Sequence, residues 1–198
     1  MRTGWLVAYV IIALCLNTVS TVMAQFYGQM PSWLKNNNIL YNIHSMTRVF
    51  FFSFYIITVR PYKHISLLTG LLVAYIVFVI INFIFFEPIL YLSPNLFAAE
   101  SIVLLVMCMS YFFRSIDDES DTYWLKQPSF LVIGGICFYE VVTFFVFLFF
   151  NTINYSTEHK DRVFADALLM VYTVSYVILC VLLAIALYKN RKKIATTL

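Results

Sequence analysis

Residues 64–86 read HISLLTGLLVAYIVFVIINFIFF, a stretch that contains no Asp, Glu, Lys or Arg. A helix rises about 1.5 Å per residue, so about 20 apolar residues cross the roughly 30 Å of hydrocarbon in a bilayer. Backbone polar groups within lipid must be satisfied by a helix or a closed barrel, and this stretch lacks the polar alternation of a barrel strand. It therefore predicts a membrane-spanning helix.

Five further stretches have the same character. We predict spanning helices at about 5–24, 39–59, 64–86, 93–113, 128–150 and 163–188. The longest connection is residues 114–127, so residues 1–198 are expected to form one domain. The predicted fold class is all-α, a polytopic transmembrane bundle of about six helices. Gly134-Gly135 in the fifth stretch predicts a close approach to a neighbouring helix or a mild kink.

The overall composition agrees with a chain that lies in a lipid bilayer. Hydrophobic residues make up 62% of the 198 residues and charged residues 12%, against about 45–50% and about 25% in soluble domains. A basic stripe with interleaved aromatic residues is missing, so nucleic acid is not an expected partner. The four cysteines lie in apolar stretches without a paired spacing, which favours buried packing residues over a disulfide framework.

The distribution of Lys and Arg predicts the orientation in the membrane. With the N-terminus in the cytoplasm, nine of the 13 Lys and Arg lie on the cytoplasmic side and three on the other, and Arg48 lies within the membrane. The basic run at 189–193 is the strongest anchor. We therefore expect a multi-pass protein of the cell (inner) membrane with both termini in the cytoplasm.

The first stretch has an alternative interpretation. Arg2, the apolar core and Val22-Met23-Ala24 before Gln25 also match a secretory signal peptide with a small-residue cleavage site. Cleavage would leave five helices in the same orientation. We expect the first helix to be retained.

The few polar side chains inside the predicted helices are the candidate site residues. A charge near a helix centre costs about 2.5–3.5 kcal/mol on insertion scales, so such residues need a reason to be there. Under the expected orientation all of them lie near mid-membrane or in its outer half. They are Asn17, His44, Arg48, Asn82, Glu100 and Glu140, with Asp166 near the start of the last helix.

Arg48 is expected to meet Glu100 or Glu140, because both acids lie at a similar depth. The cluster is either an internal ion pair that holds the helices together or a polar cavity, open to the outside, that binds a small ligand or responds to pH. His44 shares a helix face with Arg48, four residues away. Because there are two acids and one arginine, one acid is expected to lack a cation. A buried carboxyl without a cation favours its protonated form, which makes Glu100 or Glu140 a candidate proton-linked switch.

Metal binding and catalysis have little support. His44, Glu100 and Glu140 could contribute metal ligands, but no second histidine stands at ligand spacing within the helices. The motifs of serine hydrolases, zinc proteases and P-loop proteins do not occur. We expect no metal and no cofactor, and enzymatic activity is the least favoured class.

Three short segments carry a resemblance: residues 38–44 (NILYNIH), 111–113 (YFF) and 128–135 (PSFLVIGG) with Phe138-Tyr139. Together they resemble a family of uncharacterised bacterial membrane proteins of about seven helices. Some members are similar to the membrane input modules of sensor histidine kinases. Relative to that family we expect one N-terminal helix fewer and no kinase domain after the basic tail, and Arg48 stands where the resemblance implies an acidic residue.

The leading hypothesis is a non-enzymatic module for sensing or protein interaction. The outer-half polar cluster would be its input. The acidic run at 117–121 and the basic tail would be its output, toward a membrane or cytoplasmic signalling partner or a second copy of the chain. The alternative is a small transporter or channel subunit, and an intramembrane metal-dependent enzyme is the third hypothesis.

Overall fold

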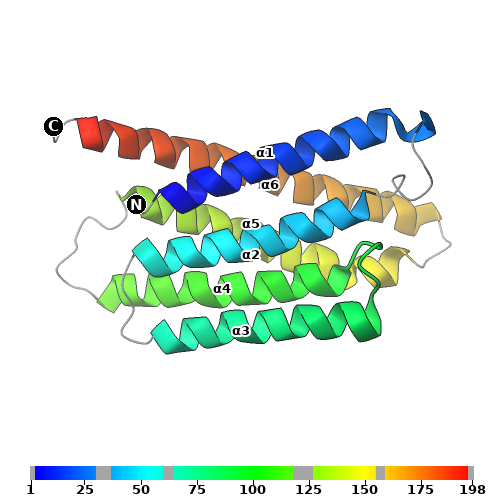
Figure 1. Cartoon of the computed structure of the whole chain (residues 1–198), viewed down its shortest axis with the longest axis horizontal. Coiled ribbons are helices and arrows are strands. Elements are labelled where there is room, and N and C mark those ends of the chain that lie inside the picture. The colour runs from blue at the N-terminus through cyan, green and yellow to red at the C-terminus, as the bar shows by residue number, and fades with distance from the viewer. Residues whose placement is uncertain (1–2, 30–36, 60–64, 118–126, 155–158, 196–198) are drawn as a thin grey trace.

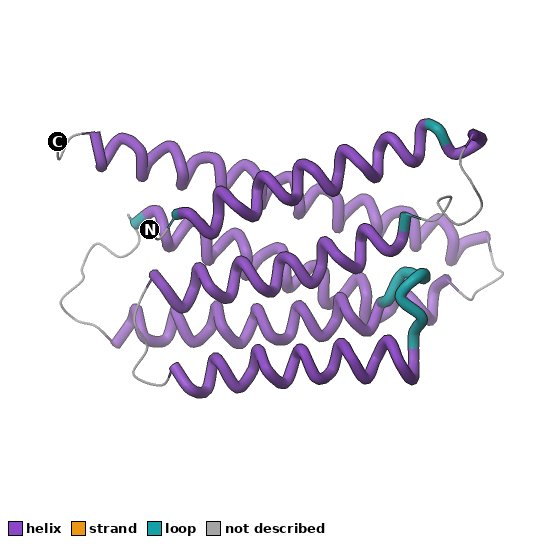
Figure 2. Tube along the Cα trace, viewed as in Figure 1, coloured by secondary structure: helices purple, strands orange, loops and turns teal. Residues whose placement is uncertain are grey.

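The computed structural model describes residues 3–29, 37–59, 65–117, 127–154 and 159–195. Within these ranges the chain forms six α-helices and no strand (Figures 1 and 2). A 3-10 turn, η1 (Tyr27–Gln29), follows the first helix, and a π-helical turn, η3 (Asn82–Phe86), continues the third. The predicted all-α bundle is confirmed. Its helices are α1 (Gly4–Gln25), α2 (Asn38–Val59), α3 (Ile65–Ile81), α4 (Pro94–Asp117), α5 (Pro128–Asn154) and α6 (His159–Ala195).

Each predicted stretch corresponds to one helix, and the largest difference is in α6. This helix begins at residue 159 rather than 163 and ends at 195 rather than 188. The additional residues at its end include the basic run of the tail. Lys and Arg are good helix formers, so the helix continues after the apolar pattern stops. Residues 118–126, which hold most of the acidic run, lie outside the described residues.

Five of the described helices are long and apolar enough to cross a membrane, as is typical of a multi-pass membrane protein. The expectation of six such helices is therefore met in five. The exception is α2. It is 22 residues long, as α1 is, but its mean hydropathy is too low. The reason is that its buried face carries polar side chains: Asn42, His44, Ser45, Arg48 and Ser53.

Consecutive helices run in opposite directions, so the start of α1 and the end of α6 lie at the same end of the bundle (Figure 1). Helix α5 packs between α4 and α6, and α2 packs against α1, α3, α4 and α5. The core lies where α2, α4 and α5 meet, at Phe52, Leu104 and Ile136, all of which are inaccessible to solvent. Short connections between antiparallel neighbours are typical of helical bundles.

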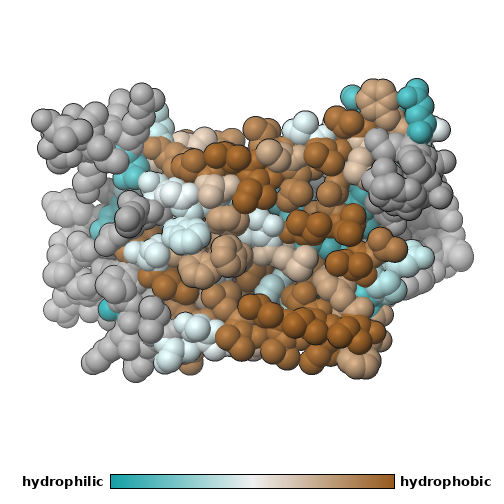
Figure 3. All heavy atoms as spheres, viewed as in Figure 1, coloured by the Kyte–Doolittle hydropathy of each residue, from teal (hydrophilic) through white to brown (hydrophobic). Residues whose placement is uncertain are grey.

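The outer face of the bundle is apolar. Figure 3 shows hydrophobic side chains across the middle of the visible face and hydrophilic ones toward the ends. Helix α3 contributes exposed Ile76 and Ile80, η3 contributes exposed Phe85, and α6 contributes exposed Met170 and Val177. Exposed apolar surface on this scale is unusual for a soluble monomer and suits contact with lipid.

The close approach predicted at the glycine pair is found at Gly135. A Cβ atom on this residue would lie 3.0 Å from Leu182 Cδ1 of α6, whereas one on Gly134 would meet nothing within 4 Å. Helix α6 therefore packs directly on the backbone of α5, as small residues allow in membrane bundles.

Candidate functional site

Arg48 and Glu100 form an ion pair at the centre of the bundle. Arg48 Nε donates to Glu100 Oε1 at 2.5 Å, and Nη2 donates to Oε2 at 2.9 Å. Both side chains are 0% exposed. This fork-to-carboxylate geometry is the strongest form of hydrogen-bonded charge pair, and it joins α2 to α4.

Two tyrosines complete the surroundings of the guanidinium. Arg48 Nη1 donates to the hydroxyl of Tyr139 on α5 and, at 3.4 Å, to that of Tyr172 on α6. The Tyr139 hydroxyl in turn donates to the Tyr172 hydroxyl at 2.8 Å. Arg48 Cζ also lies 5.0 Å from the Tyr139 ring centre and 5.7 Å from that of Phe97, within cation–π range. One cation thus connects α2, α4, α5 and α6.

The second acid lies beside this network but outside the ion pair. Glu140 on α5 is fully buried, and its Oε2 accepts a hydrogen bond from Ser101 Oγ at 2.9 Å. Its Oε1 has no hydrogen-bond partner among the described residues. Glu100, in contrast, accepts a further hydrogen bond from Ser45 Oγ. Of the two candidate acids, Glu100 is therefore the ion-pair partner of Arg48, and Glu140 forms no salt bridge with the described residues.

His44 belongs to a neighbouring group of polar side chains, separate from the ion pair. Its Nε2 lies 3.3 Å from the Tyr9 hydroxyl of α1, and its ring stacks on Tyr9 and meets the edge of Tyr176. Asn17 Nδ2 donates to the Tyr176 hydroxyl at 3.4 Å. This group links α1, α2 and α6 on the side of α2 next to Arg48.

Asn82 lies in a third place, where the end of α3 meets the start of α4. Its Nδ2 donates to Ser93 Oγ at 2.9 Å and to Glu87 Oε2 at 3.3 Å. The backbone N–H of Ser93 donates to Asn42 Oδ1 at 3.2 Å, and Ser93 Oγ accepts from the N–H of Leu96 at 3.2 Å. Ser93 thus caps α4, and the group satisfies polar groups at this end of the bundle.

The residues predicted as one cluster therefore separate into three groups. His44, Glu100 and Glu140 do not converge, and among the described residues no group of three His, Cys, Asp or Glu side chains could hold a metal ion. Asp166 is exposed at the first residue of the apolar part of α6, away from the interior.

Sequence reasoning did not identify the hydroxyl partners of the network. Tyr139 and Tyr172 contact the cation directly, while Ser45 and Ser101 contact the two acids. The available signal was the position of these tyrosines in the middle of apolar helices. Tyrosines of an interfacial belt stand at helix ends, where the ring is in lipid and the hydroxyl in water.

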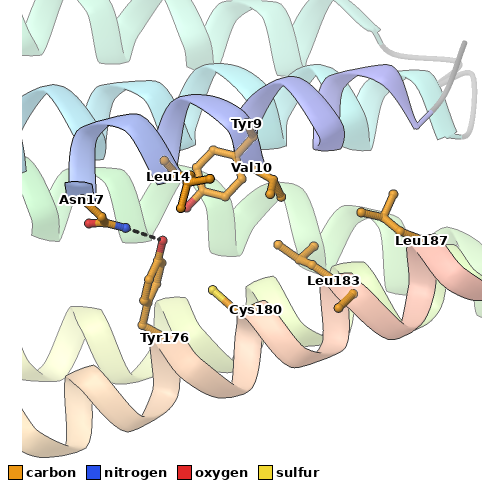
Figure 4. Close-up of a pocket in the computed structure, with 10 residues that line it drawn as sticks. Tyr9, Val10, Leu14, Asn17, Tyr176, Cys180, Leu183 and Leu187 are labelled. Atoms are coloured by element: carbon orange, nitrogen blue, oxygen red, sulfur yellow. Dashed lines mark hydrogen bonds between the residues drawn. The ribbon is translucent and has the colours of Figure 1, made fainter. Parts of the chain in front are cut away.

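A crevice separates α1 from α6 (Figure 4). Its volume is about 260 Å³. The two helices are not among the closely packed pairs, and α1 is held to the bundle mainly by α2. Tyr9, Asn17 and Tyr176 form one end of the crevice, so it adjoins the polar group around His44.

Comparison of the chain with family models, with curated proteins and with solved structures gives no match. The resemblance to membrane input modules therefore stays a prediction.

Proposed function

We propose that this chain is a non-enzymatic sensory module of the membrane, in which α1 is the element that responds. The observation that carries the proposal is the contrast between two parts of the bundle. The Arg48 network fixes α2, α4, α5 and α6 to one another through hydrogen bonds to one cation. Helix α1 lies outside this network and borders a crevice on its α6 side.

The input of the proposed module is the crevice rather than the charge network. Arg48 and Glu100 are sealed from the surface and satisfy each other, so a small ligand has no access to them. The crevice, in contrast, is bordered by exposed Val10 and Leu14 of α1 and is open to molecules in the lipid. An interior sealed in this way also favours sensing over a transport path, which requires a polar route between the two faces.

A route for coupling connects α1 to the centre of the bundle. Tyr9 contacts His44 through its hydroxyl and its ring, and it packs against Phe52 with ring centres 4.5 Å apart. His44 precedes Arg48 by one helical turn on the same face of α2. A shift of α1 relative to α6 therefore acts on the helix that carries the buried cation.

The output of the module would be a change in the surface at the end of the bundle where α1 starts and α6 ends. Both lie at one end, so movement of α1 changes the surface next to the α6 tail (Figure 1). The excess of Lys and Arg places this end in the cytoplasm in our proposal, with α1 retained as part of the protein. A signalling partner or a second copy of the chain would bind there.

Spin-label distances test this proposal. Labels at Gly4 and Tyr188 report on α1 against α6, and labels at Ile116 and Tyr188 report on two helices of the fixed core at the same end. Gly4 accepts a side chain, because a Cβ there meets nothing within 4 Å, and Tyr188 and Ile116 are exposed. The native cysteines are first replaced by alanine.

In lipid vesicles we expect the Gly4–Tyr188 pair to give two resolved distance populations and the Ile116–Tyr188 pair to give one. An equilibrium of this kind is the minimum that a sensor needs, since a ligand acts by shifting populations that already exist. A single narrow distance for both pairs would rule out α1 as a responding element. Flux of protons or potassium through the same vesicles above that of empty ones would favour the transporter instead.

A further inference from the structure

The chemistry of the crevice walls indicates what kind of molecule fits it. The lining is mostly apolar and comes from both helices: Val10, Ala13 and Leu14 of α1, and Leu183, Ala184 and Leu187 of α6. Figure 4 shows the α1 and α6 side chains facing one another across the gap. No charged side chain is among the lining residues. An ionised ligand would therefore lose its hydration without a counter-charge, which leaves an uncharged molecule as the suitable occupant.

One end of the crevice offers hydrogen bonds. Asn17 and Tyr176 meet there at 3.4 Å, a long contact, and the Asn17 side chain makes no other hydrogen bond with the described residues. Asn17 is exposed eight residues before the end of α1, about 12 Å into the span at about 1.5 Å per residue. Among the described residues this carboxamide therefore has a carbonyl oxygen without a hydrogen-bond partner and a weakly engaged N–H group, at a depth where polar groups are costly.

The size of the crevice limits the shape of its occupant. Ligand pockets for drug-sized molecules measure about 300–1,000 Å³, and the volume here is about 260 Å³. A transmembrane helix is about 10–12 Å across with its side chains, too wide to enter. A slender chain with one polar group fits, its chain along Leu183 and Leu187 and its polar group at Asn17.

We propose that the crevice binds an uncharged, slender, membrane-dissolved molecule that carries a hydroxyl or carbonyl group, of the class of long-chain alcohols and ketones. Its oxygen takes the hydrogen bond of Asn17 Nδ2, and a hydroxyl also donates to Asn17 Oδ1. This inference rests on the proposed sensory function and names the class of its ligand.

The test uses hexadecanol that carries a diazirine in its chain, in phosphatidylcholine vesicles that contain the full chain. After illumination, mass spectrometry locates the labelled residues. We expect labelling at 10–17 of α1 and 176–187 of α6 to exceed that of the exposed face of α3 at least fivefold. Unlabelled hexadecanol should compete, and hexadecane, which lacks the hydroxyl group, should compete several-fold less well.

Two variants and one control sharpen the result. Asn17→Leu removes the polar end and Ala184→Phe fills the crevice, so each should reduce the labelling several-fold. Thr18→Leu is the matched control, because Thr18 is exposed on α1, does not line the crevice and donates to its own helix at Leu14 O. Equal labelling of α3, or labelling that Asn17→Leu leaves unchanged, would overturn the proposal.

The two proposals fail in different ways. Labelling of the crevice together with a single α1 position in the spin-label experiment supports the ligand class and contradicts sensing. Two α1 positions without crevice labelling support sensing and contradict this ligand class.

Discussion

Replacement of Glu100 by glutamine is expected to lower the free energy of unfolding by about 3–5 kcal/mol, the typical cost of leaving one partner of a buried ion pair uncompensated. The carboxylate accepts from Arg48 at both oxygens and from Ser45 as well. Glutamine keeps the shape but removes the negative charge, so the guanidinium would remain charged in a region without water. Reversible unfolding in mixed detergent micelles measures the loss.

Glu140→Gln is the matched control, since it makes the same chemical change at another fully buried acid of the bundle. Glu140 has no salt bridge, and one of its oxygens has no hydrogen-bond partner among the described residues. Such a carboxyl has a lower free energy when neutral, and glutamine can still accept from Ser101. We expect a change within about 1 kcal/mol. Equal large losses in both variants would contradict the assignment of Arg48 to Glu100.

Arg48→Met is the second large effect, and its reversal by a second substitution is the more specific result. Methionine alone leaves the Glu100 carboxylate buried without a cation, which costs about 3–5 kcal/mol. The double variant Arg48→Met with Glu100→Met replaces both charges with apolar side chains. Such replacements are often neutral or stabilising, and the Tyr139 and Tyr172 hydroxyls still bond each other at 2.8 Å.

The expected outcome is therefore a double variant more stable than either single variant. Thermal unfolding of the four proteins in the same micelles gives the coupling energy of the pair. Additive losses would mean that the two side chains act independently, which the geometry does not allow.

The helices could be predicted from sequence because lipid imposes one simple requirement, a long apolar segment. That requirement finds α3 with η3 without ambiguity, since Ser66–Phe86 form one continuous apolar span of 21 residues. It is weakest for α2, where the inward face is polar and the mean hydropathy falls. The long end of α6 was missed for the opposite reason, because residues outside lipid can be helical without being apolar.

For the site residues, the sequence predicts only how deep each one lies along its helix. Glu100 and Glu140 lie at depths that both suit Arg48, and the choice between them depends on helix rotation. Rotation is set by packing contacts such as that of Gly135 on Leu182, which a single sequence does not reveal. Depth alone groups Asn82 with the charges, although its partners Glu87 and Ser93 lie in the turn between α3 and α4.

The crevice was beyond prediction for a related reason. Asn17 was identified as a polar residue within the first helix, but its position at the edge of a cavity depends on the space left between α1 and α6. Tyr9 and Tyr176 connect that space to His44, and no motif in the sequence marks either of them.

The ion pair at the centre of a lipid-embedded bundle is most directly tested by solid-state NMR in vesicles. Nitrogen-15 on the arginine side chains and carbon-13 on the glutamate carboxyls report their proximity through dipolar dephasing. We predict strong dephasing of one carboxyl signal, which disappears in Glu100→Gln and persists in Glu140→Gln. A Glu100 carboxyl that shows no coupling to arginine nitrogen would contradict the structure of the site.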